Sequence, residues 1–70
     1  MPIGAMPSSV IRFHRYDADT RALLIVFTSG RRYVYRGLPA DIAKAFGDAD
    51  SKGTFFNAEI RDRFDYEEMD

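Results

Sequence analysis

The sequence contains no cysteine, only three prolines and only five glycines among its 70 residues. Without cysteine, the chain can form neither a disulfide framework nor a thiolate metal site. A domain of this length buries only about 60% of the surface that its unfolded chain exposes, so its core has to be dense. Six phenylalanines and four tyrosines are available, and each such ring can bury on the order of 150 Å² or more. We therefore expect an aromatic core, which either suffices alone or is completed by a second copy of the chain.

Long hydrophobic runs are missing as well. No stretch approaches the ~20 apolar residues of a membrane span, and the first residues, MPIGAMP, lack the basic start and the apolar run of a signal peptide. We interpret residues 1–7 as a flexible N-terminal arm. Together with the absence of cysteine, these features predict a cytoplasmic protein without a membrane partner.

An excess of either sign of charge is lacking, since the net charge is −1, but the charges are unevenly distributed along the chain. Four of the eleven acidic residues lie in the last six positions, at Asp65, Glu67, Glu68 and Asp70. Residues 1–64 therefore carry ten basic and seven acidic groups, or a charge of +3. We interpret residues 65–70 as an acidic C-terminal tail. The mildly basic remainder is compatible with nucleic-acid binding, although an ordinary solvated surface has the same balance.

Three segments have the composition of β-strands, at residues 10–16, 22–28 and 31–36. The middle segment, ALLIVFT, is almost continuously apolar, which predicts the central strand of a sheet. A turn at DADT follows the first strand, because a short Asp side chain accepts a hydrogen bond from the backbone two residues on. Gly30 supplies the positive φ that the second turn needs. No repeat or linker interrupts the chain, so residues 8–64 form a single domain.

The alternation of side chains along the third strand divides it into two faces. Tyr33 and Tyr35 share one face. The other face carries Arg32, Val34 and Arg36. The register of the hairpin stays open at this point: a two-residue turn places the tyrosines beside Leu24 and Val26, whereas a three-residue bulged turn places them beside the odd-numbered residues of 22–28.

Two amphipathic helices follow the strands. Pro39 suits the first turn of one helix and Gly47 its C-terminal end, with an apolar stripe of Leu38, Ile42, Ala45 and Phe46. Ser51 can cap the N-terminus of the second, which is expected to run to about Arg63. Its apolar stripe consists of Phe55, Phe56, Ile60 and Phe64. The predicted fold class is α+β: a three-stranded antiparallel sheet followed by two short helices packed on one face, in the order β-β-β-α-α.

The residues of familiar active sites are not assembled in this sequence. His14 is the single histidine, and there is no cysteine to pair with it. The DADT turn matches the D-x-D-x-T form of phosphoryl-transferring hydrolases, but that chemistry needs a parallel α/β sheet that 70 residues cannot build. No glycine-rich phosphate loop is present. We expect a protein that is not an enzyme and that carries no cofactor and no catalytic residues.

The segment 48–59, DADSKGTFFNAE, resembles a calcium-binding loop between two helices. Asp48, Asp50 and Glu59 occupy liganding positions. Lys52, however, lies where an oxygen ligand should meet the cation, so it repels the ion and removes one ligand. Ser51 is also expected to open a helix inside this loop. We therefore predict no metal site.

The ordered motifs of the chain resemble those of the KTSC domain family. The motifs are Ser8-Ser9, Tyr16-Asp17, Leu23-x-Ile25-x-Phe27-x-Ser29-Gly30, Tyr33-x-Tyr35, Gly37-Leu38-Pro39, Ser51-Lys52-Gly53-x-Phe55-Phe56-Asn57 and Ile60-Arg61. They cover nearly the whole domain, and His14 departs from the smaller or apolar residue expected at its position. The family occurs at the C-terminus of some lysyl-tRNA synthetases and as free-standing bacterial or phage proteins, and RNA binding has been suggested from that context. The resemblance also favours the bulged-turn register, with Tyr33 and Tyr35 in the core.

The first functional hypothesis is a small binding domain for nucleic acid, with RNA preferred to DNA as the resemblance implies. Arginine and lysine side chains would neutralise phosphates, and polar side chains of the second helix would extend the contact. The candidate residues are Arg12, Arg32, Arg36, Lys52, Asn57 and Arg61. Tyr33 and Tyr35 would stack on bases if they were exposed, but aromatic residues facing two amphipathic helices are expected to be core.

The alternative hypothesis is a protein-interaction or self-association module. Leu24, Val26 and Val34 would form an apolar stripe on the sheet face that points away from the core. Stripes of this kind tend to be covered by a partner. A homodimer formed through this face would also enlarge the core.

Overall fold

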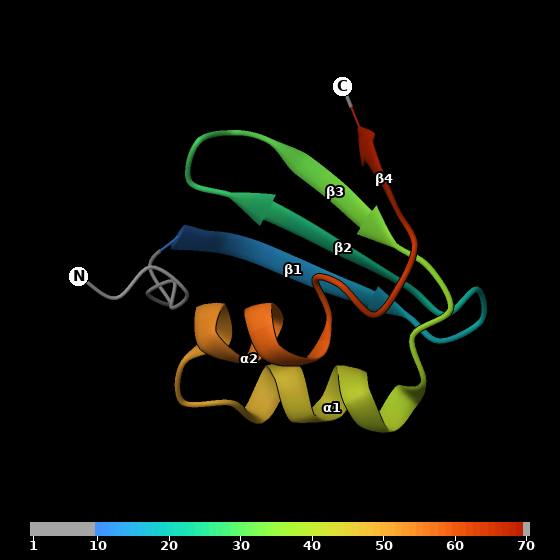
Figure 1. The fold of residues 1–70 in the computed structure, drawn as a ribbon. Coiled ribbons are helices and arrows are strands. Elements are labelled where there is room, and N and C mark those ends of the chain that lie inside the picture. The colour runs from blue at the N-terminus through green and yellow to red at the C-terminus, as the bar shows by residue number, and fades with distance from the viewer. Residues whose placement is uncertain (1–9, 70) are drawn as a thin grey trace.

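The computed structural model describes residues 10–69, and within them an antiparallel sheet forms one layer and two helices form the other (Figure 1). The elements are β1 (Ile11–Asp17), β2 (Ala22–Phe27), β3 (Arg32–Tyr35), α1 (Ala40–Asp48), α2 (Lys52–Glu59) and β4 (Tyr66–Met69). Both helices lie on the same face of the sheet. The α+β class, the three main strands and the two helices on one face are thereby confirmed. The N-terminal arm predicted for residues 1–7 and the motif Ser8-Ser9 lie outside the described residues.

The sheet has a fourth strand that sequence analysis did not predict. Its strand order is β1-β2-β3-β4, and every neighbouring pair is antiparallel. Residues 66–69 of the segment interpreted as an acidic tail thus form β4, which pairs Tyr66 with Tyr35 and Glu68 with Tyr33. The chain returns to the sheet through a backbone hydrogen bond of 2.8 Å, in which the Arg36 N–H donates to the Asp65 carbonyl.

The β2–β3 hairpin has the bulged three-residue turn, so the register that the resemblance favours is confirmed. Tyr33 pairs with Ile25, and Tyr35 pairs with Leu23. The N–H of Phe27 donates to the Arg31 carbonyl at 2.9 Å, and Gly30 between them has a φ of +95°. Only glycine adopts this left-handed conformation without a steric penalty, which explains the residue at this position.

Local hydrogen bonds fix the first turn and the start of the second helix as predicted. In the turn after β1, the Asp19 N–H donates to the Asp17 carboxylate at 3.0 Å. Ser51 caps α2, since its hydroxyl accepts a hydrogen bond from the Thr54 N–H at 3.3 Å. Helix α2 therefore begins inside the calcium-loop-like segment.

The remaining helix ends differ from the predictions. Pro39 is the N-cap of α1 and lies one residue before its first turn, and Gly47 lies inside the helix, which ends at Asp48. Helix α2 ends at Glu59 and does not continue to Arg63. The reason is that Ile60 leaves helical geometry, with φ −122°, and becomes fully buried.

The core lies between the helices and the sheet. Its buried residues are Leu23, Ile25, Tyr35, Leu38, Phe46, Phe56 and Ile60. Ala45 was predicted on the apolar stripe of α1 but is exposed. The Tyr16 hydroxyl donates to the Leu38 carbonyl at 2.7 Å and so ties β1 to the connection between β3 and α1. No helix within residues 10–69 is long and apolar enough to cross a membrane.

Candidate functional site

The sheet has one face that neither α1 nor α2 covers, called here the open face. The register places on it Leu24, Val26, Arg32 and Val34, together with the residues that pair with them. Its members are Phe13, Arg15, Leu24, Val26, Arg32, Val34, Glu67 and Met69. Phe13 is 51% exposed and Met69 43% exposed, which is unusual for large apolar side chains. The predicted apolar stripe is thus present and is wider than three residues.

Two of the predicted arginines meet at one end of the open face. Arg12 and Arg32 line a shallow hollow of about 510 Å³ together with Phe13, Val26 and Gly30. The pairing of β1 with β2 shifts its register between Ile11 and Phe13, and Arg12 lies at this irregularity. The hollow therefore combines an exposed aromatic ring with two guanidinium groups.

Arg36 lies in a different electrostatic setting. Its Nη2 donates to the Glu67 Oε1 at 2.9 Å, and both side chains are more than half exposed. Strand β4 thus brings a carboxylate onto the part of the open face where sequence analysis expected a free cation. The positive charge of this face is concentrated toward β1, where Arg12 and Arg15 make no ion pair with the described residues 10–69.

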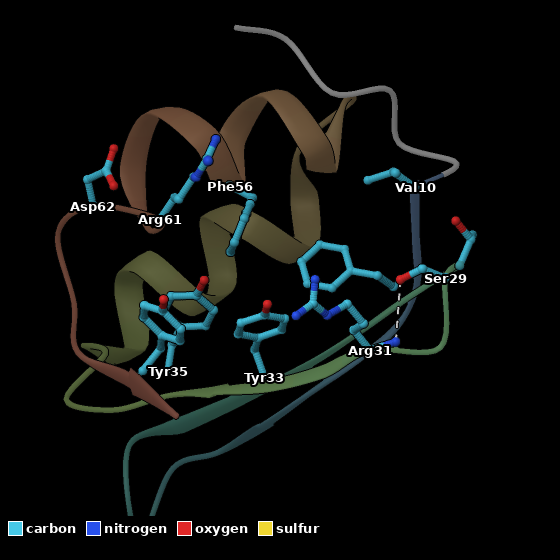
Figure 2. A pocket seen from close by; sticks show the side chains of 11 residues that line it. Val10, Ser29, Arg31, Tyr33, Tyr35, Phe56, Arg61 and Asp62 are labelled. Atoms are coloured by element: carbon cyan, nitrogen blue, oxygen red, sulfur yellow. Dashed lines mark hydrogen bonds between the residues drawn. The ribbon is translucent and has the colours of Figure 1, made fainter. Parts of the chain in front are cut away.

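The second hollow lies on the opposite side of the sheet, between β3, β4 and the end of α2 (Figure 2), and we call it the aromatic cleft. Its volume is about 450 Å³. The lining residues are Val10, Phe27, Thr28, Ser29, Arg31, Tyr33, Tyr35, Phe56, Arg61, Asp62 and Tyr66. Tyr35 is only 3% exposed and belongs to the core, whereas Tyr33 is half-buried and Tyr66 is 56% exposed.

The candidate residues of the second helix do not join the arginines of the open face. Arg61 lines the aromatic cleft, and its Nη1 donates to the Asn57 Oδ1 at 3.1 Å. Lys52 lies at the start of α2, where its Nζ donates to the Ala49 carbonyl at 3.3 Å. The six predicted residues are therefore distributed over two layers of the molecule, with Arg12, Arg32 and Arg36 on the sheet.

Burial changes the protonation behaviour of two side chains near these surfaces. Burial raises the pKa of Tyr35 to about 12, with smaller contributions from the neighbouring Tyr66 and Tyr33. Burial also lowers the pKa of His14, and the charge of Lys52 lowers it further. The His14 ring packs edge-on against Phe46, with centroids 4.9 Å apart. Both effects on the pKa of His14 favour its neutral form, which suits a ring that packs against Phe46.

Several residues of both surfaces were missed by sequence analysis, namely Phe13, Arg15, Arg31 and Tyr66. The alternation along β1 contains the signal for the first two, because Tyr16 faces the core and residues at odd positions then face away. Tyr66 gave no such signal, since its strand could not be recognised. Within residues 10–69, no group of three or more His, Asp or Glu side chains is placed to hold a metal ion.

Comparison with known proteins gives matches over most of the chain. The family model described as the KTSC domain matches residues 7–64. A crystal structure of a KTSC domain protein from Yersinia pestis superposes with a TM-score of 0.81 at 32% identity, covering all of this chain and 94% of the other. A protein of Stutzerimonas stutzeri described as uncharacterized is 38% identical over 53 residues, which is 76% of this chain and 75% of that protein.

Lysine–tRNA ligases are also similar to this chain. The ligase of Trichormus variabilis is 32% identical and that of Nostoc punctiforme 34% identical, each over 68 residues, or 97% of this chain. The chain spans only 12% of the length of these ligases. The similarity therefore concerns one small segment of a much larger protein.

Proposed function

Because this chain belongs to the KTSC domain family, we propose that it is a non-catalytic binding domain that holds single-stranded nucleic acid, RNA in preference to DNA, on the open face of its sheet. The observation that supports this proposal most is the hollow that Phe13, 51% exposed, lines together with Arg12 and Arg32. Exposed aromatic rings on a sheet stack with unpaired bases, while neighbouring cations neutralise phosphates.

The preference for RNA comes from the relatives. Three lysine–tRNA ligases contain a segment similar to this chain, and their name makes an RNA one of their ligands. A domain that contributes RNA contacts to such a protein needs a cationic aromatic surface but no catalytic groups. The open face has those properties near β1, whereas carboxylates of β4 pair with Arg31 and Arg36, the residues on either side of β3.

The experiment is a titration of fluorescent single-stranded RNA and DNA with the full chain at several salt concentrations. The double variant Arg12→Ala/Arg32→Ala should weaken binding and lower the slope of log K against log salt by about 1.4, since each lost phosphate contact removes about 0.7 for single strands. Phe13→Leu should weaken binding with little change of this slope. Lys44→Ala is the matched control, because Lys44 lies on α1 and pairs with Asp48. Absence of binding below about 100 μM at moderate salt would contradict the proposal.

Self-association is the second candidate function, and the exposure of Phe13 and Met69 favours it. Two copies packed through their open faces would cover this apolar stripe. In sedimentation experiments, Val34→Thr should then shift the protein toward the monomer, because it places a hydroxyl in the interface while keeping the shape of the side chain. A purely monomeric wild-type protein at high concentration would exclude this function.

A further inference from the structure

The aromatic cleft is separate from the open face and is not explained by it. We propose that this cleft holds one unstacked base of the bound single strand, an inference that rests on the proposed function. Its volume of about 450 Å³ lies within the range of roughly 300–1,000 Å³ that is common for small-molecule sites. Five of its lining side chains are aromatic: Phe27, Tyr33, Tyr35, Phe56 and Tyr66.

The rings of the cleft form one contiguous aromatic lining. Phe27 contacts both Tyr33 and Phe56, with centroid distances of 5.6 and 5.7 Å. Tyr35 also contacts both, at 6.4 and 5.3 Å. Tyr33 from the sheet and Phe56 from the helix layer are thus linked through Phe27 and Tyr35 (Figure 2). A flat ring that enters the cleft can stack on Tyr33, which is half-buried and therefore accessible, over a floor that includes the buried Phe56 and Tyr35.

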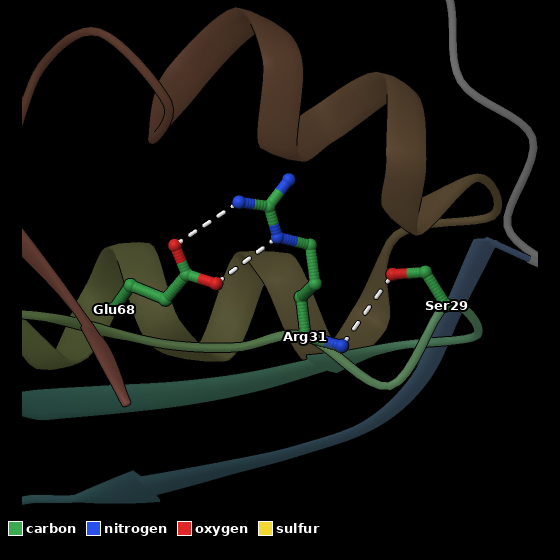
Figure 3. Close-up of polar contacts among 3 residues, drawn as sticks. All are labelled: Ser29, Arg31 and Glu68. Atoms are coloured by element: carbon green, nitrogen blue, oxygen red, sulfur yellow. Dashed lines mark hydrogen bonds and ion pairs between the residues drawn. The ribbon is translucent and has the colours of Figure 1, made fainter. Parts of the chain in front are cut away.

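The charges around the cleft favour a neutral ring over a phosphate. The Arg31 guanidinium binds Glu68 through two hydrogen bonds, Nε to Oε2 at 3.0 Å and Nη2 to Oε1 at 3.2 Å (Figure 3). Across the cleft, Arg61 is followed by Asp62. Each arginine is therefore accompanied by a carboxylate, and an anion gains little attraction here compared with the end of the open face near Arg12.

Arg31 can still donate hydrogen bonds to a ligand. Its Nη1 is not used by Glu68, and Figure 3 shows this nitrogen on the side of the guanidinium that points toward α2. The guanidinium carbon lies 5.9 Å from the centroid of the Tyr33 ring. A base stacked on Tyr33 would thus present its carbonyl or ring-nitrogen acceptors to the N–H groups of a guanidinium that Glu68 holds in place.

The β2–β3 hairpin connects the two hollows. Thr28, Ser29 and Arg31 line the aromatic cleft, whereas Gly30 and Arg32 line the hollow of the open face. A Cβ added at Gly30 would meet no atom within 4 Å, so the turn presents little bulk between the two. A strand whose phosphates lie at Arg32 can therefore pass around this turn and place the next base in the cleft.

The test compares an oligoadenylate of about six nucleotides with its abasic counterpart, which keeps the phosphates and lacks the bases. Tyr33→Leu should weaken binding of the intact strand by about 5- to 150-fold, the usual effect of losing one stacked base. The same variant should bind the abasic strand as the wild type does. Phe55→Leu is the matched control, since Phe55 lies on α2 and packs against Phe46 outside the cleft.

A measurement on the unmodified protein guards against a loss of folding in the variant. Titration with adenosine alone should shift the NMR signals of Tyr33 and Phe56 in a saturable way and leave those of Phe55 in place. If Tyr33→Leu binds the intact strand as tightly as the wild type while Arg12→Ala/Arg32→Ala binds it weakly, the base site is wrong and the proposed function survives. If the wild type binds neither strand, both are wrong.

The chain itself could fill the cleft, because Val10 lies at its border and nine residues precede it. Nuclear Overhauser contacts between the methyl groups of Ile3 or Met6 and the Tyr33 ring in the ligand-free protein would overturn the inference. Their absence, together with adenosine shifts at Tyr33, would support it.

Discussion

The two faces of the sheet are built by the same strands and differ sharply in composition. The face toward the helices carries Leu23, Ile25 and Tyr35, all at most 3% exposed. The open face alternates with it and carries arginines beside Phe13 and Met69, which are about half exposed. The buried core residues therefore lie on one side of the layer and the proposed phosphate contacts on the other, so substitutions on the open face should leave stability nearly unchanged.

The largest expected effect comes from comparing one phenylalanine of each side. Phe46→Ala should lower the free energy of unfolding by about 3–5 kcal/mol, since it removes a fully buried ring. That loss is a large part of the total stability of so small a domain. Phe13→Ala should cost less than about 1 kcal/mol, because half of its ring is already in water. Urea titrations followed by circular dichroism measure the free energy of unfolding of both variants. Equal losses in the two variants would contradict the distinction between the faces.

The pH dependence of stability should also originate on the covered side. Burial holds the pKa of Tyr35 at about 12 in the folded protein, above the unfolded value of about 10. The folded state therefore keeps this proton longer than the unfolded state does. Its stabilisation is fully present below about pH 10 and is lost between about pH 10 and 12, to a limit of about 2–3 kcal/mol. Tyr35→Phe should remove most of this alkaline loss in urea titrations at each pH, and an unchanged pH slope would show that another group causes it.

A smaller effect on stability is expected from the hydrogen bond that links β1 to the connection between β3 and α1. Tyr16→Phe removes the 2.7 Å bond from its hydroxyl to the Leu38 carbonyl and leaves the ring in place. The cost should be about 1 kcal/mol, the usual net value of such a bond. Hydrogen exchange should quicken at the Leu38 amide, which donates to the Arg21 carbonyl in the same connection. Unchanged stability would mean that water replaces the lost hydroxyl.

The smallest effect is expected from the ion pair on the open face. Arg36→Ala removes the pair with Glu67, in which both side chains are more than half exposed. Exposed pairs of this kind contribute little to stability, so urea titrations should barely separate the variant from the wild type. RNA affinity should fall less than in Arg12→Ala, because Glu67 already offsets the charge of Arg36. A larger fall than in Arg12→Ala would place the working part of the open face at β3 and not at β1.

Much of the fold could be predicted because local chemistry determines it. The hydrogen bond from the Asp19 N–H to Asp17, the cap at Ser51 and the positive φ of Gly30 each depend on residues close in sequence. Helix ends were less predictable, since they depend on packing: α2 stops where Ile60 enters the core. For the candidate site, the alternation of side chains along a strand correctly placed Arg32 and Tyr33 on opposite faces of the sheet. It could not show that Arg36 meets Glu67 or that Arg61 lies on the other layer.

Strand β4 was the least predictable element. Its sequence, YEEM, has two carboxylates and little β propensity. The strand is held by backbone hydrogen bonds to β3 and by Tyr66, whose ring lies 5.3 Å from the rings of both Tyr33 and Tyr35. Such pairing between distant segments is visible only when the sheet is assembled.

The acidic strand β4 also bears on the tendency of the protein to aggregate. An unpaired sheet edge invites strands of other chains, and aggregation commonly starts there. Without β4, strand β3 would form that edge, and its unpaired backbone N–H and C=O groups would lie beside Tyr33 and Tyr35. Strand β4 occupies this position instead and carries Glu67 and Glu68, and charged side chains on an edge strand disfavour pairing with a further strand. Such an outer strand is expected to slow the growth of the sheet into fibres.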